Sequence, residues 1–253
     1  MKAFTLLFLA HILGDYYFQP AKLAERKSRG IGWVLLHALI YAATFALSLL
    51  LLGGGYIWAV AICAGTHLVI DVVKQLILNA RAKQGVLTVK GERAAFCIDQ
   101  ILHITIILAS SVCVYKYFEI SVPPFMDAAG KAMHIGAYRL LTYAGMGLAV
   151  MKPANVFVKR MLVTEKPDEG EPVSVTAERR RAGAYIGALE RLLAIALMVF
   201  RQYGAIALVF TAKSIARFRQ LDDREFAEYY IFGTLLSAAT AIGVFVLLKL
   251  FGA

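Results

Sequence analysis

AGTHLVIDVVKQ, residues 64–75, places three ionisable side chains, His67, Asp71 and Lys74, inside an otherwise apolar run. Their spacings of four and three residues put all three on one face of an α-helix. The run from Tyr56 to Leu78 is long enough to cross the roughly 30 Å hydrocarbon core of a bilayer. Because ionisable groups at that depth are costly and usually face a protein interior or water, this stretch predicts a functional site inside a membrane protein.

Two further apolar segments carry the same pair of residue types. His11 and Asp15 lie four apart in the first segment, and Gln19 follows after another four. Asp99 and His103 are also four apart in a later segment, in the reverse order. On a helix each pair shares one face, so three segments each present an imidazole and a carboxylate together.

The composition indicates a polytopic membrane protein. Hydrophobic residues make up 60% of the 253 residues, and the mean hydropathy is +0.66. We therefore expect an all-α transmembrane helical bundle with about eight spans. The expected spans are roughly 3–19, 32–52, 56–78, 94–117, 137–158, 183–200, 202–219 and 226–250. The net charge of +10 shows no basic stripe interleaved with aromatic residues, so nucleic acid is not an expected partner.

Lys and Arg predict the orientation of these spans. They gather in the loops that follow the first, third, fifth and seventh spans, near Lys27, Lys90, Arg160 and Arg219, and are sparse in the other loops. The positive-inside rule therefore places the basic loops in the cytoplasm and both termini outside it.

This orientation aligns the three pairs in depth. In each pair the carboxylate lies nearer the cytoplasm, and the imidazole lies about one turn, roughly 6 Å, deeper. His37 falls in the same half of the second span. Imidazoles and carboxylates that converge at one depth predict a site for one or two divalent metal ions, with zinc preferred. The expected metal ligands are His11, His67, His103, Asp15, Asp71, Asp99 and His37, and the three carboxylates are also the expected catalytic groups.

Two alternatives remain open at these positions. The carboxylates either ligate the metal directly or orient the ligating imidazoles. A structural network of interhelical hydrogen bonds is the other interpretation, above all for His37 considered alone.

Several polar side chains are expected to contact an anionic substrate. Lys74, one turn toward the cytoplasm from Asp71, either neutralises acidic charge or holds an anion. Cations in the second half of the chain either form a phosphate-binding patch or pair with the nearby Glu190 and Glu228. The expected substrate-binding residues are Lys74, Gln19, Gln100, Arg191, Lys213 and Arg217.

Four regions describe the expected organisation. Residues 1–118 form the transmembrane His/Asp region. Residues 119–163 form an outer loop, in which Pro123 and Pro124 oppose helix at the start, and a span kinked at Pro153. Residues 164–182 form a cytoplasmic linker, and residues 183–253 form a transmembrane hairpin with an extra span.

The motifs of the first 110 or so residues form a specific set. They are His11-x-x-x-Asp15-x-x-x-Gln19, the isolated His37, His67-x-x-x-Asp71-x-x-Lys74 and Asp99-Gln100-x-x-His103. Together they resemble a bacterial family of multi-spanning inner-membrane proteins of unknown function, which implies the same location for this chain. The chain also resembles, more loosely, membrane-bound metal-dependent hydrolases. The Asp-x-Asp-His and His-x-x-x-x-His elements of those hydrolases are absent here, so this resemblance implies a metal rather than a particular substrate.

Three functions follow as hypotheses. The first is a metal-dependent hydrolase that acts on a lipid-linked or phosphate-containing substrate from the cytoplasmic leaflet. The second is a proton- or ion-coupled transporter with a His/Asp relay, and the third is a non-catalytic scaffold with a structural metal. In each case membrane lipids are the expected partners.

Overall fold

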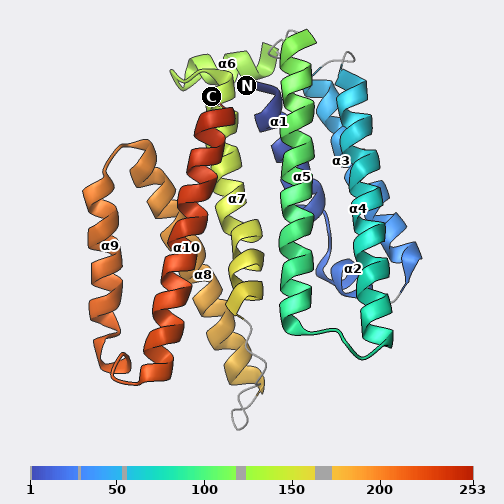
Figure 1. Ribbon diagram of the computed structural model, residues 1–253. Coiled ribbons are helices and arrows are strands. Elements are labelled where there is room, and N and C mark those ends of the chain that lie inside the picture. The colour runs from blue at the N-terminus through green and yellow to red at the C-terminus, as the bar shows by residue number, and fades with distance from the viewer. Residues whose placement is uncertain (1, 28–29, 53–55, 118–123, 163–172, 253) are drawn as a thin grey trace. The chain divides into compact units, whose positions relative to one another are not determined.

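The computed structural model describes residues 2–27, 30–52, 56–117, 124–162 and 173–252. This part of the chain contains helices and turns and no strand (Figure 1). The elements are α1 (Lys2–Ile12), the π-helical turn η1 (Leu13–Tyr17), α2 (Ala21–Arg26), α3 (Ile31–Leu52), α4 (Ile57–Lys83), α5 (Val89–Tyr117), α6 (Pro124–Ala132), α7 (Ala137–Leu162), α8 (Val173–Val199), α9 (Tyr203–Ala216), the 3-10 turn η4 (Phe218–Gln220) and α10 (Arg224–Phe251).

Five helices of the described part are long and apolar enough to cross a membrane. They are α3, α4, α5, the portion of α8 from residue 182 to 199, and α10. Together they indicate a helical membrane protein, as the composition predicts. The first expected span forms α1 and η1, which are shorter, and α9 is an apolar helix of 14 residues. A count of eight spans and the orientation of the termini stay predictions.

The chain folds as two compact units, which we describe separately. Unit 1 comprises residues 1–145 and 248–253, and unit 2 comprises residues 146–247. The unit boundaries fall inside α7 and α10 rather than in the loops where the sequence suggested region boundaries.

Unit 1 is built around α1. Every residue from Ala3 to Ile12 is buried, as expected for a helix that is apolar on all sides. α1 packs against α3 and α5, α3 packs against α4, and α4 packs against α5. These four helices therefore form a closed ring, and the side chains that point into the ring meet at its centre. The end of α10 joins this unit, where Thr5 Oγ1 donates a hydrogen bond of 3.1 Å to the Gly252 carbonyl.

One local expectation needs correction. We expected Pro123 and Pro124 to prevent helix at the start of the outer loop, yet α6 begins at Pro124. Proline suits the first helical position because its missing N–H is not needed there and its φ is already helical. Within the expected linker 164–182 the structure describes residues 173–182, which belong to α8; residues 164–172 lie outside the described residues, so the linker stays a prediction.

Candidate metal centre

Each helix of the ring in unit 1 contributes polar side chains to its centre. They are His11 and Asp15 from α1 and η1, His37 and Tyr41 from α3, His67, Asp71 and Lys74 from α4, and Asp99, Gln100 and His103 from α5. All four imidazoles are buried, as are Asp71 and Asp99. The four-residue spacings within each segment therefore aim each pair inward, as the sequence predicts.

A first group consists of His11, His67 and His103. Their ligand atoms all lie within 4.8 Å of one another. The ring of His67 stacks on that of His103, with centroids 4.4 Å apart and planes 30° apart. Three imidazoles from three helices thus converge at one point, in an arrangement that suits a zinc or similar ion.

A second group shares His67 and consists of Asp15, His37 and His67. His37 Nε2 lies 3.0 Å from His67 Nε2, 3.1 Å from Asp15 Oδ1 and 3.5 Å from Asp71 Oδ2. His67 Nε2 lies 3.6 Å from the same Asp71 oxygen. A protonated His37 Nε2 has one N–H, which cannot be donated to three neighbours at once, whereas a cation held among these atoms would contact all of them.

Several buried imidazole nitrogens have no hydrogen-bond partner in the described structure. Both ring nitrogens of His103 are in this state, and so are Nδ1 of His37 and Nδ1 of His67. Nearly all buried polar groups in proteins are paired, and an unpaired one costs about 1–3 kcal/mol. The unpaired nitrogens lie in the same rings that form the two groups, so they are available as ligand atoms for a metal ion.

Two lysines balance part of the acidic charge. Lys74 Nζ lies 2.7 Å from Asp71 Oδ1 and 2.8 Å from Asp99 Oδ1, and Lys27 Nζ lies 2.8 Å from Asp71 Oδ2. Lys74 is thus an ion-pair partner of two carboxylates, which is the neutralising role that the sequence left open. Its other expected role, as an anion contact, stays a prediction.

Tyr41 fixes the positions of two imidazoles. Its hydroxyl lies 3.1 Å from His11 Nδ1, and its ring stacks on His67 with centroids 3.6 Å apart and planes 3° apart. Gly14 makes this position possible, because a Cβ on Gly14 would lie 3.0 Å from Tyr41 Cδ2. Hydrogen bonds to the second ring nitrogen set the tautomer and orientation of a ligating histidine.

The π-helical turn η1 brings Asp15 into the centre and ends at Tyr17. Its widened geometry is seen in the hydrogen bond of 2.7 Å from Phe18 N to Leu13 O, five residues back. We expected Gln19 to extend the face of His11 and Asp15, but Gln19 lies in a bend beyond the end of the helix. The shared face therefore stops at Asp15.

Gln100 holds carboxylates of the centre. Its Nε2 donates to Asp99 Oδ2 at 3.0 Å and to Asp15 Oδ2 at 3.5 Å, and its Oε1 accepts a 2.7 Å bond from the Tyr16 hydroxyl. Its expected contact with substrate stays a prediction.

The charged residues of the second half fall in unit 2 and separate into two places. Arg191 is buried and donates to Val150 O at 2.7 Å, to Ser237 Oγ at 3.0 Å and to Asn155 Oδ1. Lys213 Nζ pairs with Glu190 Oε2 at 2.7 Å. Part of this charge therefore pairs within the unit, which is one of the two alternatives that the sequence left open.

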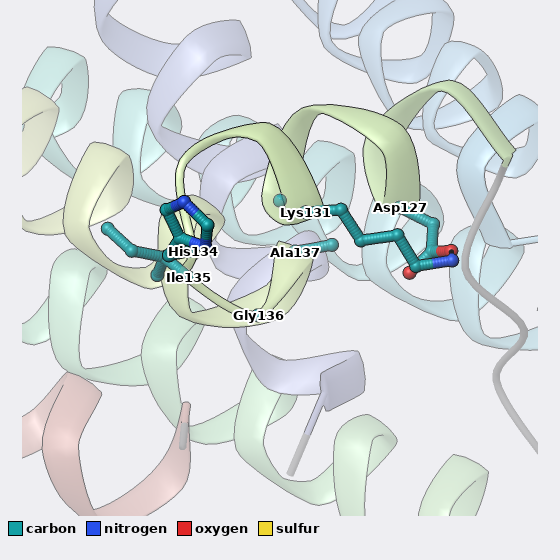
Figure 2. Close-up of a pocket in the computed structure, with 7 residues that line it drawn as sticks. Asp127, Lys131, His134, Ile135, Gly136 and Ala137 are labelled. Atoms are coloured by element: carbon teal, nitrogen blue, oxygen red, sulfur yellow. Dashed lines mark ion pairs between the residues drawn. The ribbon is translucent and has the colours of Figure 1, made fainter.

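A cavity of about 330 Å³ lies elsewhere in unit 1, at the turn between α6 and α7 (Figure 2). Its lining includes the exposed ion pair of Lys131 with Asp127, and His134. None of the polar residues of the ring centre lines it. Because His134 is exposed and far from the ring centre in sequence, a substitution there serves as a control in experiments that replace the buried histidines.

Sequence reasoning missed three contributors to the centre: Tyr41, Lys27 and Tyr16, whose hydroxyl donates to Gln100. Tyr41 follows His37 by four residues, so the spacing rule that found the other pairs also places Tyr41 on the inner face of α3. Lys27 was assigned only to a basic loop, because no local pattern in the sequence links it to Asp71.

Comparison with known proteins gives one match. Residues 3–126 match a family described as "Protein of unknown function (DUF3307)". No curated protein and no solved structure matches the chain. The matched segment contains every residue of the ring centre, and it agrees with the expected resemblance to a family of unknown function. The looser resemblance to metal-dependent hydrolases receives no support from these comparisons.

Proposed function

We propose that the centre of unit 1 binds a divalent first-row metal ion, preferably zinc, and that the protein is a metal-dependent hydrolase of the membrane. Its substrate would be a lipid-linked or phosphate-containing molecule that enters from the cytoplasmic leaflet. The orientation predicted from the basic loops places the carboxylates nearer that leaflet than the imidazoles.

The observation that carries this proposal is the convergence of His11, His67 and His103 with unpaired buried nitrogens. Zinc prefers imidazole nitrogen together with carboxylate oxygen, and both donor types are present. A structural network of hydrogen bonds would be expected to satisfy its own members, whereas His103 has no partner for either ring nitrogen.

The charges of the centre also favour a bound cation. With neutral imidazoles, the carboxylates of Asp15, Asp71 and Asp99 exceed the ammonium groups of Lys27 and Lys74 by one negative charge. Uncompensated charge is costly at membrane depth. A divalent ion with a bound hydroxide, the nucleophile that the proposed hydrolysis needs, would carry one positive charge and balance this excess.

The proposed roles of the carboxylates follow from their surroundings. A bound divalent ion activates water and polarises a phosphoryl oxygen, which is the chemistry that a hydrolase needs.

The carboxylates of Asp71 and Asp99 form ion pairs with lysines. Asp15 pairs with no lysine among the described residues and has the most exposed side chain of the three, at 11%. Asp15 is therefore the best acceptor for a proton from water.

A proton-coupled transporter is the second candidate. Side-chain contacts of 3.5 Å or less link Tyr16, Gln100, Asp15, His37 and His67 in one chain. Such chains of Asp and His conduct protons in membrane proteins.

The first experiment measures metal content. Purified full-length protein in detergent should retain a divalent ion by elemental analysis, and His103→Ala should lose it. His134→Asn is the matched control, because His134 is exposed and asparagine tolerates its φ of 52°. Equal metal content in His103→Ala and His134→Asn would rule out the metal centre.

The second experiment separates the functions. Phosphate release from a phosphatidic acid probe and proton flux into proteoliposomes are measured for wild type and Asp15→Asn. The hydrolase proposal requires phosphate release that Asp15→Asn lowers at least 100-fold. Proton flux without phosphate release would support the transporter, and bound metal with neither activity would support a scaffold.

A further inference from the structure

Unit 2 contains an apolar groove of about 280 Å³ among α8, α9 and α10. Met198 of α8, Phe210 of α9 and Ala238 and Ile242 of α10 are part of its lining. The apolar helix α9 has no buried residue, so its packing leaves this apolar surface uncovered. Because α8 and α10 include candidate membrane spans, we expect a groove between them to lie at membrane depth.

One face of α9 leads from this groove to a cationic end. Tyr203, Ile206, Phe210 and Lys213 of α9 follow one another at spacings of three or four. Such residues share one helix face. Arg217 comes four residues after Lys213, directly after the helix ends at Ala216. Tyr203, Ile206 and Phe210 line the groove, and the two cations follow from about one turn onward, roughly 5 Å along the axis.

The cationic end has a defined geometry. Lys213 Nζ lies 5.4 Å and Arg217 Cζ lies 5.8 Å from the centroid of the Tyr230 ring. Lys213 also pairs with Glu190, and no acidic partner of Arg217 is seen among the described residues. Two cations and one carboxylate leave a net positive charge at the end of an apolar groove.

The Tyr230 hydroxyl lies at the same end and lacks a partner. It is buried, and the described structure gives it no hydrogen bond. A buried phenol normally finds an acceptor. An anion at this end would accept a hydrogen bond from the Tyr230 hydroxyl and would balance the excess positive charge of Lys213 and Arg217.

We propose that this groove binds one acyl chain of an anionic phospholipid, whose phosphate is held by Lys213, Arg217 and the Tyr230 hydroxyl. The groove is too small for a partner helix, which is about 10–12 Å wide, whereas a single acyl chain is thin and apolar. This site lies wholly in unit 2 and does not depend on the metal centre.

Native mass spectrometry of the delipidated full-length protein in detergent tests the proposal. Phosphatidylglycerol and phosphatidylcholine with identical acyl chains are titrated separately, and inorganic phosphate is used as a third probe. We expect one phosphatidylglycerol to bind in preference to phosphatidylcholine. Arg217→Gln should weaken its binding about five-fold, and Arg219→Gln, on the neighbouring turn η4, should not.

Two further variants separate the groove from general lipid contact. Ala238→Phe fills the groove and should abolish the specific binding, whereas Ala239→Phe places the same ring on an exposed neighbour and should not. Tyr230→Phe should weaken phosphatidylglycerol binding without lowering the thermal stability of the lipid-free protein, because it removes an unpaired hydroxyl.

Three results would overturn the proposal. They are equal binding of the two lipids, unchanged binding in Ala238→Phe, and saturation by inorganic phosphate with no gain from the acyl chains. A mass shift that corresponds to a second copy of the chain, and that Ala238→Phe removes, would assign the groove to dimerisation instead.

Discussion

The role of Lys74 is set by the two carboxylates that it contacts. Its spacing from Asp71 puts it on the inner face of α4, where it was expected to neutralise acidic charge or to hold an anion. In the folded protein its Nζ contacts oxygens of both Asp71 and Asp99. These carboxylates have only 3% and 4% of their side-chain surface exposed, so each needs a compensating charge.

Lys74→Met should therefore destabilise the protein strongly, by about 3 kcal/mol, because it leaves buried carboxylates unpaired. Adding Asp99→Asn to Lys74→Met should recover part of the loss. Thermal unfolding in detergent measures both effects. Lys131→Met is the control, since it breaks only the exposed pair with Asp127 and should cause no measurable loss. Equal stability of Lys74→Met and Lys131→Met would show that Lys74 does not hold these carboxylates.

Among the elements, η1 positions the centre most directly. Its π-helical geometry adds a residue to the turn that carries Asp15, and π-helical turns of this kind often occur at functional sites. Gly14 in the same turn lies against Tyr41, which in turn contacts His11 and His67. A change at Gly14 therefore reaches two imidazoles through one tyrosine.

Gly14→Ala should lower metal affinity at least ten-fold, because the added methyl group displaces Tyr41 from His11 and His67. Gly65→Ala is the matched control in α4, since nothing lies within 4 Å of its Cβ position. Alanine favours helix over glycine, so Gly65→Ala should keep the metal and raise stability by up to about 1 kcal/mol. Metal titration and thermal unfolding test both variants. Identical metal affinity in the two would contradict a positioning role for Gly14.

The proline inside α7 lies close to hydrogen bonds from Arg191 of α8, within unit 2. It continues through Pro153, which removes one backbone hydrogen bond and usually bends a helix. Arg191 of α8 donates to Val150 O and to Asn155 Oδ1 on either side of this proline. α7 is thus continuous at the kink that the sequence predicts, and Arg191 links residues on either side of Pro153 to α8.

At the scale of the whole molecule, the positive-inside rule predicts which loops face the cytoplasm. Single cysteines at exposed positions Lys22, Gln84 and Phe125 test it, in a protein whose native cysteines are replaced by alanine. Lys22→Cys and Gln84→Cys should react with an impermeant maleimide only from the cytoplasmic side, because their loops are basic. Phe125→Cys should react only from the opposite side. Labelling of Phe125→Cys from the cytoplasm would contradict the predicted orientation of the spans. It would also contradict the prediction that the carboxylates lie nearer the cytoplasm than the imidazoles.

The sequence by itself determined the class of fold and most members of the centre. Apolar runs fix where helices form, and the spacing of four residues puts His67 and Asp71, or Asp99 and His103, on one face whatever the tertiary arrangement. The high cost of ionisable groups in a membrane then directs those faces inward. Both ends of α3 and of α10 lie within two residues of the expected ones. By contrast, α4 continues to Lys83 and α5 begins at Val89, each five residues beyond the expected span and into a charged segment.

Only the tertiary structure decided how these faces meet. The ring of α1, α3, α4 and α5 brings His37 next to Asp15 and His67, and folds Lys27 back to Asp71. The different partners of Arg191 and Lys213, at Val150 and Glu190, also depend on packing. Helical periodicity acts within about two turns of one chain segment, whereas these contacts join residues 22 or more positions apart, whose meeting is set by packing in three dimensions.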